Sequence, residues 1–109
     1  MITCFIKYEI DPFKREQFEQ YAKQWGQAIP RCGADLIGYF APHEGSTTTA
    51  YGVYSLPSLA DYEAYQERLA ADPIGQDNYA FAKKEQFIRS EDRIFLKIAS
   101  SPHSKMVKP

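Results

Sequence analysis

The chain has 109 residues, enough for one domain with a modest core and not for two. Apolar residues make up 44% and charged residues 25%, as in an ordinary globular domain, and the formal net charge is −1. Because positive charge is not clustered, the chain lacks the electrostatic footprint of a protein that grips nucleic-acid phosphates, and we expect no nucleic-acid partner.

No stretch approaches the ~20 apolar residues that cross a bilayer, and the N-terminus lacks the basic segment and apolar run of a signal peptide. We therefore expect no membrane partner and a cytoplasmic location. The two cysteines, Cys4 and Cys32, show neither CxxC nor Cys/His spacing. This predicts reduced thiols and no metal site.

The first strand is predicted over residues 2–10, where ITCFIKYEI is rich in Ile, Thr, Phe and Tyr. Asp11 as N-cap and Pro12 at the first helical position predict a helix to about Ile29, with Pro30 ending it. Apolar residues at i, i+3, i+4 and i+7 spacing form one stripe along this helix: Phe18, Tyr21, Ala22, Trp25, Ala28 and Ile29.

Residues 36–56 predict a hairpin, with LIGYF and STTTAYGVYSL on either side of the loop APHEG. Ser58, with Asp61 three residues later, resembles a capping box and opens a second helix.

Pro73 ends the second helix and starts a third helical segment that runs to about Phe87. Residues 92–99, DRIFLKIA, predict the last strand. The remainder is polar and lacks periodicity, so we expect one domain over residues 1–99 and a flexible tail over 100–109.

This order of elements, with short connections and right-handed crossovers, predicts an α+β fold: a ferredoxin-like βαββαβ domain with a four-stranded antiparallel sheet. Helices would cover one face of the sheet only, yet the hairpin carries apolar residues on both parities. We expect a second copy to cover the open face, giving a homodimer and a dimeric α/β barrel with a cavity near each sheet centre. The sequence leaves undecided which set lies on the open face, Cys4, Ile6 and Tyr8 or Phe5, Lys7 and Glu9.

An ordered set of features resembles the NIPSNAP family: Tyr8 followed by Pro12, LIGYF, the Gly45 turn, Tyr54 and Ser58, Leu69 before the Asp72–Pro73 break, and SEDRIFL. The resemblance covers about Phe5 to Leu96. It implies a ferredoxin-like fold and a homodimer, and it implies no particular reaction, because the family has no agreed one. Family members often carry a polar pair where this chain has Cys4 and Ile6, so the resemblance implies a cavity for an apolar ligand, or no ligand.

Aromatic and cationic side chains are the candidate ligand-binding residues: Tyr8, Tyr39, Tyr51, Tyr54 and Arg93. The same tyrosines could instead fill the core and the dimer interface.

The candidate catalytic groups are His43 and Tyr54, either of which could move a proton. His43 lies in the hairpin loop and His103 in the tail, and we expect both to be exposed to solvent. Trp25 is expected in the core. Nothing in the sequence predicts a cofactor.

Two functions remain open. One is a NIPSNAP-like small dimeric barrel protein that binds a small apolar or aromatic ligand or a protein partner. The other is a cofactor-independent monooxygenase or isomerase of the dimeric α/β-barrel type that acts on an aromatic substrate, which rests on analogy of fold. A pocket holding a titratable group with a charge partner would favour the enzyme, and an interior packed with rings would favour binding.

RNA-recognition domains share the βαββαβ order, and AYGVY is similar to their aromatic signature. The basic residue that opens that signature is absent here, which argues against this alternative.

Overall fold

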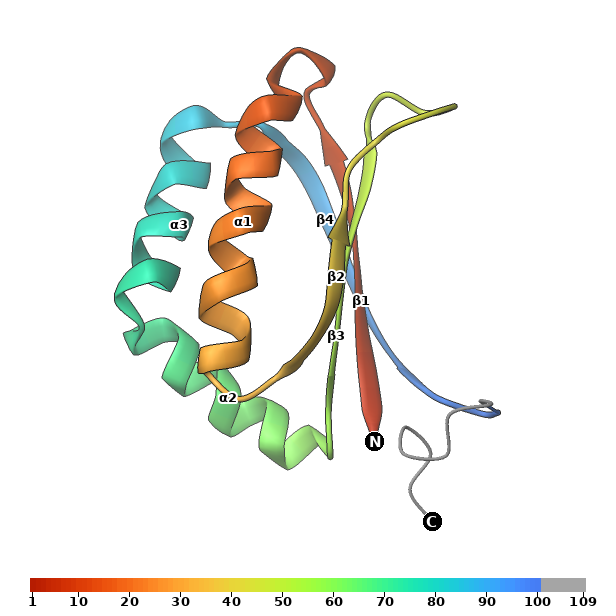
Figure 1. Cartoon of the computed structure of the whole chain (residues 1–109), viewed down its shortest axis with the longest axis vertical. Helices are drawn as coiled ribbons and strands as arrows, with labels where there is room; N and C mark the ends of the chain where they lie inside the picture. Colours follow the sequence, from red (N-terminus) through yellow and green to blue (C-terminus); the bar gives the residue numbers. More distant parts are fainter. Residues whose placement is uncertain (101–109) are drawn as a thin grey trace.

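Four strands form one antiparallel sheet, and three helices lie against one of its faces (Figure 1). The computed structural model describes residues 1–100. The elements follow in the order β1 (Ile2–Ile10), the 3-10 turn η1 (Pro12–Lys14), α1 (Arg15–Arg31), β2 (Asp35–Phe40), β3 (Thr49–Leu56), α2 (Leu59–Ala71), α3 (Pro73–Glu85) and β4 (Ile88–Lys97). The ferredoxin-like α+β fold is confirmed. The predicted tail, apart from Ser100, lies outside the described residues.

The strand order is β2-β3-β1-β4, so β1 is central and β4 forms one edge. Residue Ile6 pairs with Gly52 of β3 on one side and with Arg93 of β4 on the other. The pairing of β2 with β3 shifts by one residue between Leu36 and Gly38. Such a bulge changes the parity of the strand, so side chains three residues apart can share a face.

Local capping explains where the helices begin. Asp11 accepts a hydrogen bond from the Phe13 N–H at 2.9 Å, but it caps the 3-10 turn, and α1 starts only at Arg15. Ser58 accepts from the Asp61 N–H at 3.2 Å, which confirms it as the N-cap of α2. The Asp61 carboxylate accepts from the Ser58 hydroxyl at 2.6 Å and not from its backbone N–H, so the reciprocal bond of a capping box is replaced by a bond between side chains. Pro30 lies within the last turn of α1, so the predicted end was slightly short.

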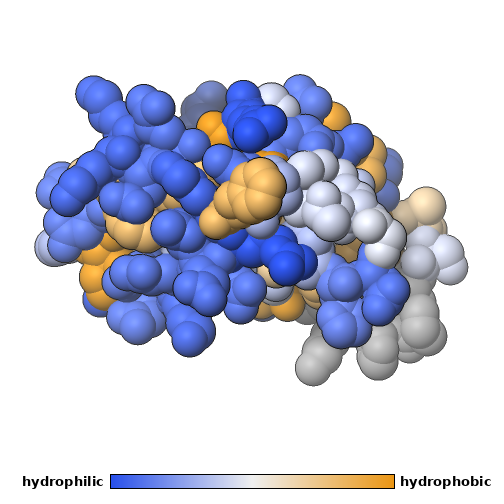
Figure 2. Space-filling model, turned by 90° about the horizontal axis from the view of Figure 1, so that it is seen from above, coloured by the Kyte–Doolittle hydropathy of each residue, from blue (hydrophilic) through white to orange (hydrophobic). Residues whose placement is uncertain are grey.

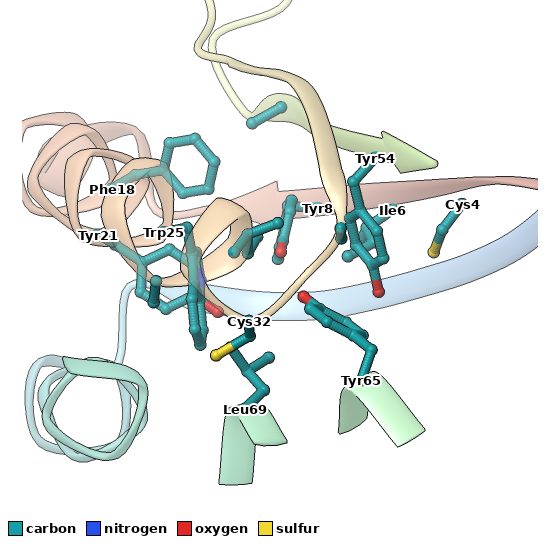
Figure 3. Close-up of a cluster of buried hydrophobic side chains, with 14 of the residues drawn as sticks. Cys4, Ile6, Tyr8, Phe18, Tyr21, Trp25, Cys32, Tyr54, Tyr65 and Leu69 are labelled. Atoms are coloured by element: carbon teal, nitrogen blue, oxygen red, sulfur yellow. The ribbon is translucent and has the colours of Figure 1, made fainter. Parts of the chain in front are cut away.

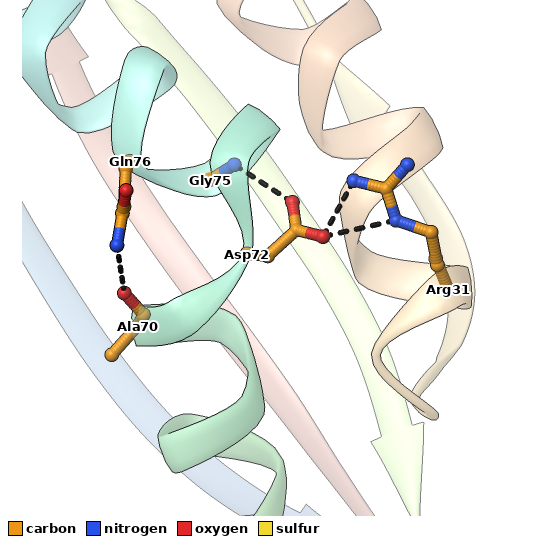
Figure 4. A network of polar contacts seen from close by, with 5 residues as sticks. All are labelled: Arg31, Ala70, Asp72, Gly75 and Gln76. Carbon is orange, nitrogen blue, oxygen red and sulfur yellow. Dashed lines mark hydrogen bonds and ion pairs between the residues drawn. The ribbon is translucent and has the colours of Figure 1, made fainter.

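Asp72 joins three helices (Figure 4). One carboxylate oxygen accepts from the Gly75 N–H at 2.9 Å and caps α3, which follows α2 without a loop. The other oxygen accepts from the Arg31 side chain at the end of α1, with Nε at 2.9 Å. The hydrogen bond from the Gly75 N–H lowers the pKa of Asp72, and burial raises it. Arg31 also lowers this pKa, so the net effect is a lowered value.

The last strand begins at Ile88, four residues before the predicted start at Asp92. That boundary was wrong because the segment Arg89–Glu91 is polar and gives no strand signal. Pairing with β1 nevertheless holds it in the sheet, where Glu91 lies opposite Tyr8.

Burial decides which face of β1 the helices cover. Cys4, Ile6, Tyr8 and Ile10 are at most 2% exposed and point toward the helices. Phe5, Lys7 and Glu9 therefore lie on the open face, together with Thr3, whose hydroxyl lies 2.8 Å from that of Ser55. The core between sheet and helices is rich in rings that meet edge to face, such as Tyr8 on Phe18 at 5.3 Å between centroids.

The open face keeps large apolar side chains in contact with solvent. Ile37, Phe40, Tyr51, Ile94 and Leu96 are each 40–53% exposed, and register places them on the side away from the helices. A hollow of about 680 Å³ runs over this face between Phe5, Ile37, Phe40, Val53 and Leu96. By contrast, the end of the molecule seen in Figure 2 is mostly hydrophilic, with scattered hydrophobic residues.

Candidate functional site

A small pocket lies between the sheet and the helices, and most of its wall is made of aromatic rings. Its volume is about 20 Å³, room for about one water molecule. Figure 3 shows the converging side chains: Tyr8 from β1, Tyr54 from β3, Tyr21 and Trp25 from α1, and Tyr65 from α2. Side chains from two strands and two helices therefore place polar atoms around one pocket.

Two tyrosine hydroxyls meet at the sheet side of the pocket. The Tyr8 and Tyr39 hydroxyl oxygens lie 3.2 Å apart. The Tyr39 ring covers Gly52 so closely that a methyl group there would lie 2.7 Å from two ring carbons. Because β2 is bulged, Tyr39 shares the helix-facing side with Leu36, and this bulge is what brings its hydroxyl to Tyr8.

Trp25 contributes a hydrogen-bond donor to the pocket wall. It is 3% exposed and lines the pocket, and its indole Nε1 has no hydrogen-bond partner among the described residues. Buried donors are normally paired, since an unpaired one costs the free energy of its lost hydration. This N–H lies beside the Tyr21 hydroxyl and is a donor for a polar group that enters the pocket.

The mouth of the pocket carries charge. Arg93 on β4 is 34% exposed and donates from Nη1 to the Tyr62 hydroxyl at 3.1 Å, while Nη2 lies 3.4 Å from a Glu91 carboxylate oxygen. Gln66 donates to the same Tyr62 hydroxyl at 2.7 Å. Phe95, also on β4, packs edge to face on Tyr62 with centroids 4.7 Å apart.

Burial keeps the phenols protonated. It raises the pKa of Tyr21 to about 12 and raises the pKa values of Tyr8, Tyr39 and Tyr54 well above the ordinary value. At neutral pH these hydroxyls are thus neutral donors and acceptors.

The guanidinium keeps its charge beside them. Burial would lower the pKa of Arg93, but the neighbouring phenolic groups of Tyr54 and Tyr62 raise it above its ordinary value.

The predicted site residues separate into two groups. Tyr8, Tyr39, Tyr54 and Arg93 line the same pocket, on the helix side of the sheet. Tyr51 lies on the open face, opposite Lys7, and is not among them.

The candidate histidines lie apart from the pocket. His43 is exposed in the loop between β2 and β3, as expected, and His103 lies outside the described residues. The described residues contain no cluster of three or more His, Cys, Asp or Glu side chains that could hold a metal ion. Cys4 and Cys32 are free and buried, and burial raises the pKa of each thiol.

Sequence reasoning missed several residues of the pocket. Trp25, expected in the core, is buried there and also lines the pocket, as does Tyr21 one turn earlier. Their i, i+4 spacing was visible, but it indicated only a core-facing stripe. Nothing in the sequence indicated that Tyr65 or Glu91 lines a pocket, because the placement of α2 brings in Tyr65 and strand register brings in Glu91.

A model of the NIPSNAP family matches residues 3–102. The chain belongs to the NIPSNAP family. The resemblance inferred from the ordered motifs is thereby confirmed. No curated protein matches the chain.

Within residues 1–100, no helix has both the length and the apolar character that crossing a bilayer requires.

Solved structures of NIPSNAP proteins are similar over nearly the whole chain. A family member from Agrobacterium tumefaciens is 28% identical, with a TM-score of 0.73 over 93% of this chain and 96% of that one. An uncharacterised NIPSNAP domain protein from Burkholderia xenovorans is 25% identical, with a TM-score of 0.73 over 94% of this chain and 100% of that one. A putative antibiotic biosynthesis monooxygenase from Nitrosomonas europaea is 11% identical, with a TM-score of 0.71 over 92% and 100% of the two chains. At that identity the likeness shows a shared fold and no shared reaction.

Proposed function

We propose that this NIPSNAP protein is a homodimer in which each subunit binds a small aromatic molecule in the pocket between its sheet and helices. One observation carries the proposal: several neutral phenol groups and an unpaired indole N–H surround one buried space. Rings supply apolar contact area, and the hydroxyls and the indole N–H fix the orientation of a polar group on the ligand.

An aromatic ligand is larger than the space of about 20 Å³, so part of it must occupy the mouth. The side chains there are only half-buried or exposed, and hydrogen bonds to the Tyr62 hydroxyl hold Arg93 and Gln66 in place. Turning Arg93 and Gln66 outward opens the mouth while the Tyr62 ring stays packed on Phe95, and it exchanges these hydrogen bonds for bonds to water.

Dimer formation rests on the open face of the sheet. Its exposed apolar side chains form one patch, whereas exposed Phe13 and Leu59 lie off that face. A patch of this kind on an uncovered antiparallel sheet marks an interface. A second copy related by a two-fold axis presents the same patch and buries it from both sides.

The dimer is tested with two matched substitutions. Ile94→Lys places an ammonium group on the open face, whereas Leu59→Lys makes the same change at a residue of similar exposure on α2, 57% against 53%. Light scattering across a dilution series should show a dimer for the native protein and Leu59→Lys, and a monomer for folded Ile94→Lys. A native protein that is monomeric at micromolar concentration would refute the dimer.

The pocket is tested with the fluorescence of Trp25, the single tryptophan of the chain. Titration with benzyl alcohol, a neutral aromatic alcohol, should change this emission to saturation. Tyr54→Phe, which removes a pocket hydroxyl, should weaken binding several-fold, and Tyr51→Phe, on the other face, should leave it unchanged. Absence of saturation, or equal effects of both variants, would contradict the pocket assignment.

A cofactor-independent oxygenase or isomerase is the second candidate, favoured by a phenol and a guanidinium that line the same pocket. Tyr54 is protonated at neutral pH and lies beside the Arg93 guanidinium, a pair that could stabilise an oxyanion on an aromatic substrate. His43 is exposed in its loop and does not line the pocket, so Tyr54 is the remaining candidate for proton transfer. Oxygen uptake with a polyphenolic substrate, lost in Tyr54→Phe and kept in Tyr51→Phe, would identify the enzyme.

A further inference from the structure

We infer that the ligand of this pocket is a small aromatic carboxylate, whose charged group binds Arg93 at the mouth and whose ring lies against Tyr62 and Phe95. This inference rests on the proposed binding function and adds the charge and shape of the ligand.

Among the residues 1–100 that line the pocket, Arg93 is the only positively charged one. Pairing with Ile6 fixes it on the helix-facing side of β4. The guanidinium has five N–H donors. One on Nη1 bonds to the Tyr62 hydroxyl and one on Nη2 faces Glu91, and the Nε donor has no partner among the described residues. A guanidinium with donors left over and a third of its side chain open to solvent is suited to a planar, two-oxygen acceptor.

Glu91 occupies the place that the ligand would take. Its carboxylate is 39% exposed and reaches Nη2 only at 3.4 Å, beyond the usual length of a charge-assisted bond. An exposed pair of this kind contributes little, so a carboxylate from the ligand can displace Glu91 into water.

An apolar surface continues from the guanidinium. Phe95 follows Arg93 by two residues on the same side of β4, is 37% exposed, and contacts the Tyr62 ring. Leu59, nearly one turn before Tyr62 on α2, is 57% exposed. A ligand ring placed here keeps its carboxylate at Arg93, which lines the pocket, so that the polar group of the ligand and not its ring reaches into the small space.

The test compares phenylacetate with phenylacetamide, two probes of nearly the same shape that differ in charge. Trp25 fluorescence and calorimetry on the intact protein at low salt should show roughly tenfold tighter binding of phenylacetate. Arg93→Gln should abolish this preference and keep binding of the amide, while Glu91→Gln should strengthen phenylacetate binding several-fold. Arg89→Gln, an exposed arginine on the same strand that faces Asp11 at 3.8 Å, serves as the matched control and should behave as the native protein.

Each outcome separates the two proposals. Equal affinity for both probes, or an equal loss in Arg93→Gln and Arg89→Gln, would overturn the carboxylate assignment and leave the pocket as a site for neutral aromatics. If neither probe nor benzyl alcohol binds, the proposed binding function itself is wrong. Opposite effects of Arg93→Gln and Glu91→Gln on phenylacetate alone would establish the inference.

Discussion

Gly52→Ala tests the packing of the sheet side of the pocket. A methyl group at Gly52 would lie 2.7 Å from two carbons of the Tyr39 ring, which real contacts do not allow. The ring cannot simply tilt away, because it is packed against Tyr8 and Phe18 with centroids 6.0 and 6.3 Å distant. The substitution must therefore displace Tyr39 and break its hydrogen bond with the Tyr8 hydroxyl.

The expected cost follows from three contributions. Overpacking of a filled core costs about 1–3 kcal/mol, and the broken hydrogen bond adds about 1 kcal/mol. Alanine restricts the unfolded chain more than glycine does, which returns about 0.5–1 kcal/mol. We expect Gly52→Ala to lower the free energy of unfolding by about 1–3.5 kcal/mol, or Tm by about 4–15 °C.

Gly26→Ala is the matched control, because a methyl group there meets no atom within 4 Å in the exposed part of α1. It should raise stability by about 0.5–1 kcal/mol, since alanine favours the helix. Urea and thermal unfolding at one protein concentration measure both changes. In a Tyr39→Leu background the cost of Gly52→Ala should fall. An unchanged cost, or a native-like Gly52→Ala, would refute the proposed contact.

Two further predictions concern pH. The pKa of Tyr21 is about 12 in the folded protein, so above its ordinary value of 10 the unfolded chain loses this proton first and stability falls as pH rises toward 12. Tyr21→Phe should remove that part of the alkaline decline, about 3 kcal/mol, and a stability–pH curve identical to the native one would contradict the burial of this hydroxyl. The pKa of Asp72 is lowered by the Gly75 N–H and Arg31, so its stabilising effect is complete above the ordinary value of 3.8 and is lost as pH falls below it. Asp72→Asn should therefore be less stable than the native protein at neutral pH and approach it in acid, whereas exposed Asp77→Asn should change little; a constant difference across pH would show that the charge of Asp72 is unimportant.

Local signals predicted most of the secondary structure because their causes are local. Ser58 specifies the start of α2, and Asp11 with Pro12 specifies the 3-10 turn before α1, by hydrogen bonds and fixed dihedral angles within a few residues. The start of β4, which the sequence placed four residues too late, shows where local signals fail. Its polar first residues become a strand only because β1 supplies the hydrogen-bonding partner.

The sequence by itself determined the order of the elements, the family and a sheet with apolar side chains on both faces, since these follow from residue type and spacing. Only the tertiary structure decided which face the helices cover and which tyrosines share the pocket. Strand register and the bulge near Leu36 place Tyr39 beside Tyr8 and send Tyr51 to the other side. Pairing between residues far apart in the chain sets these neighbours, and shifting a strand by one residue would exchange every side chain between the two faces.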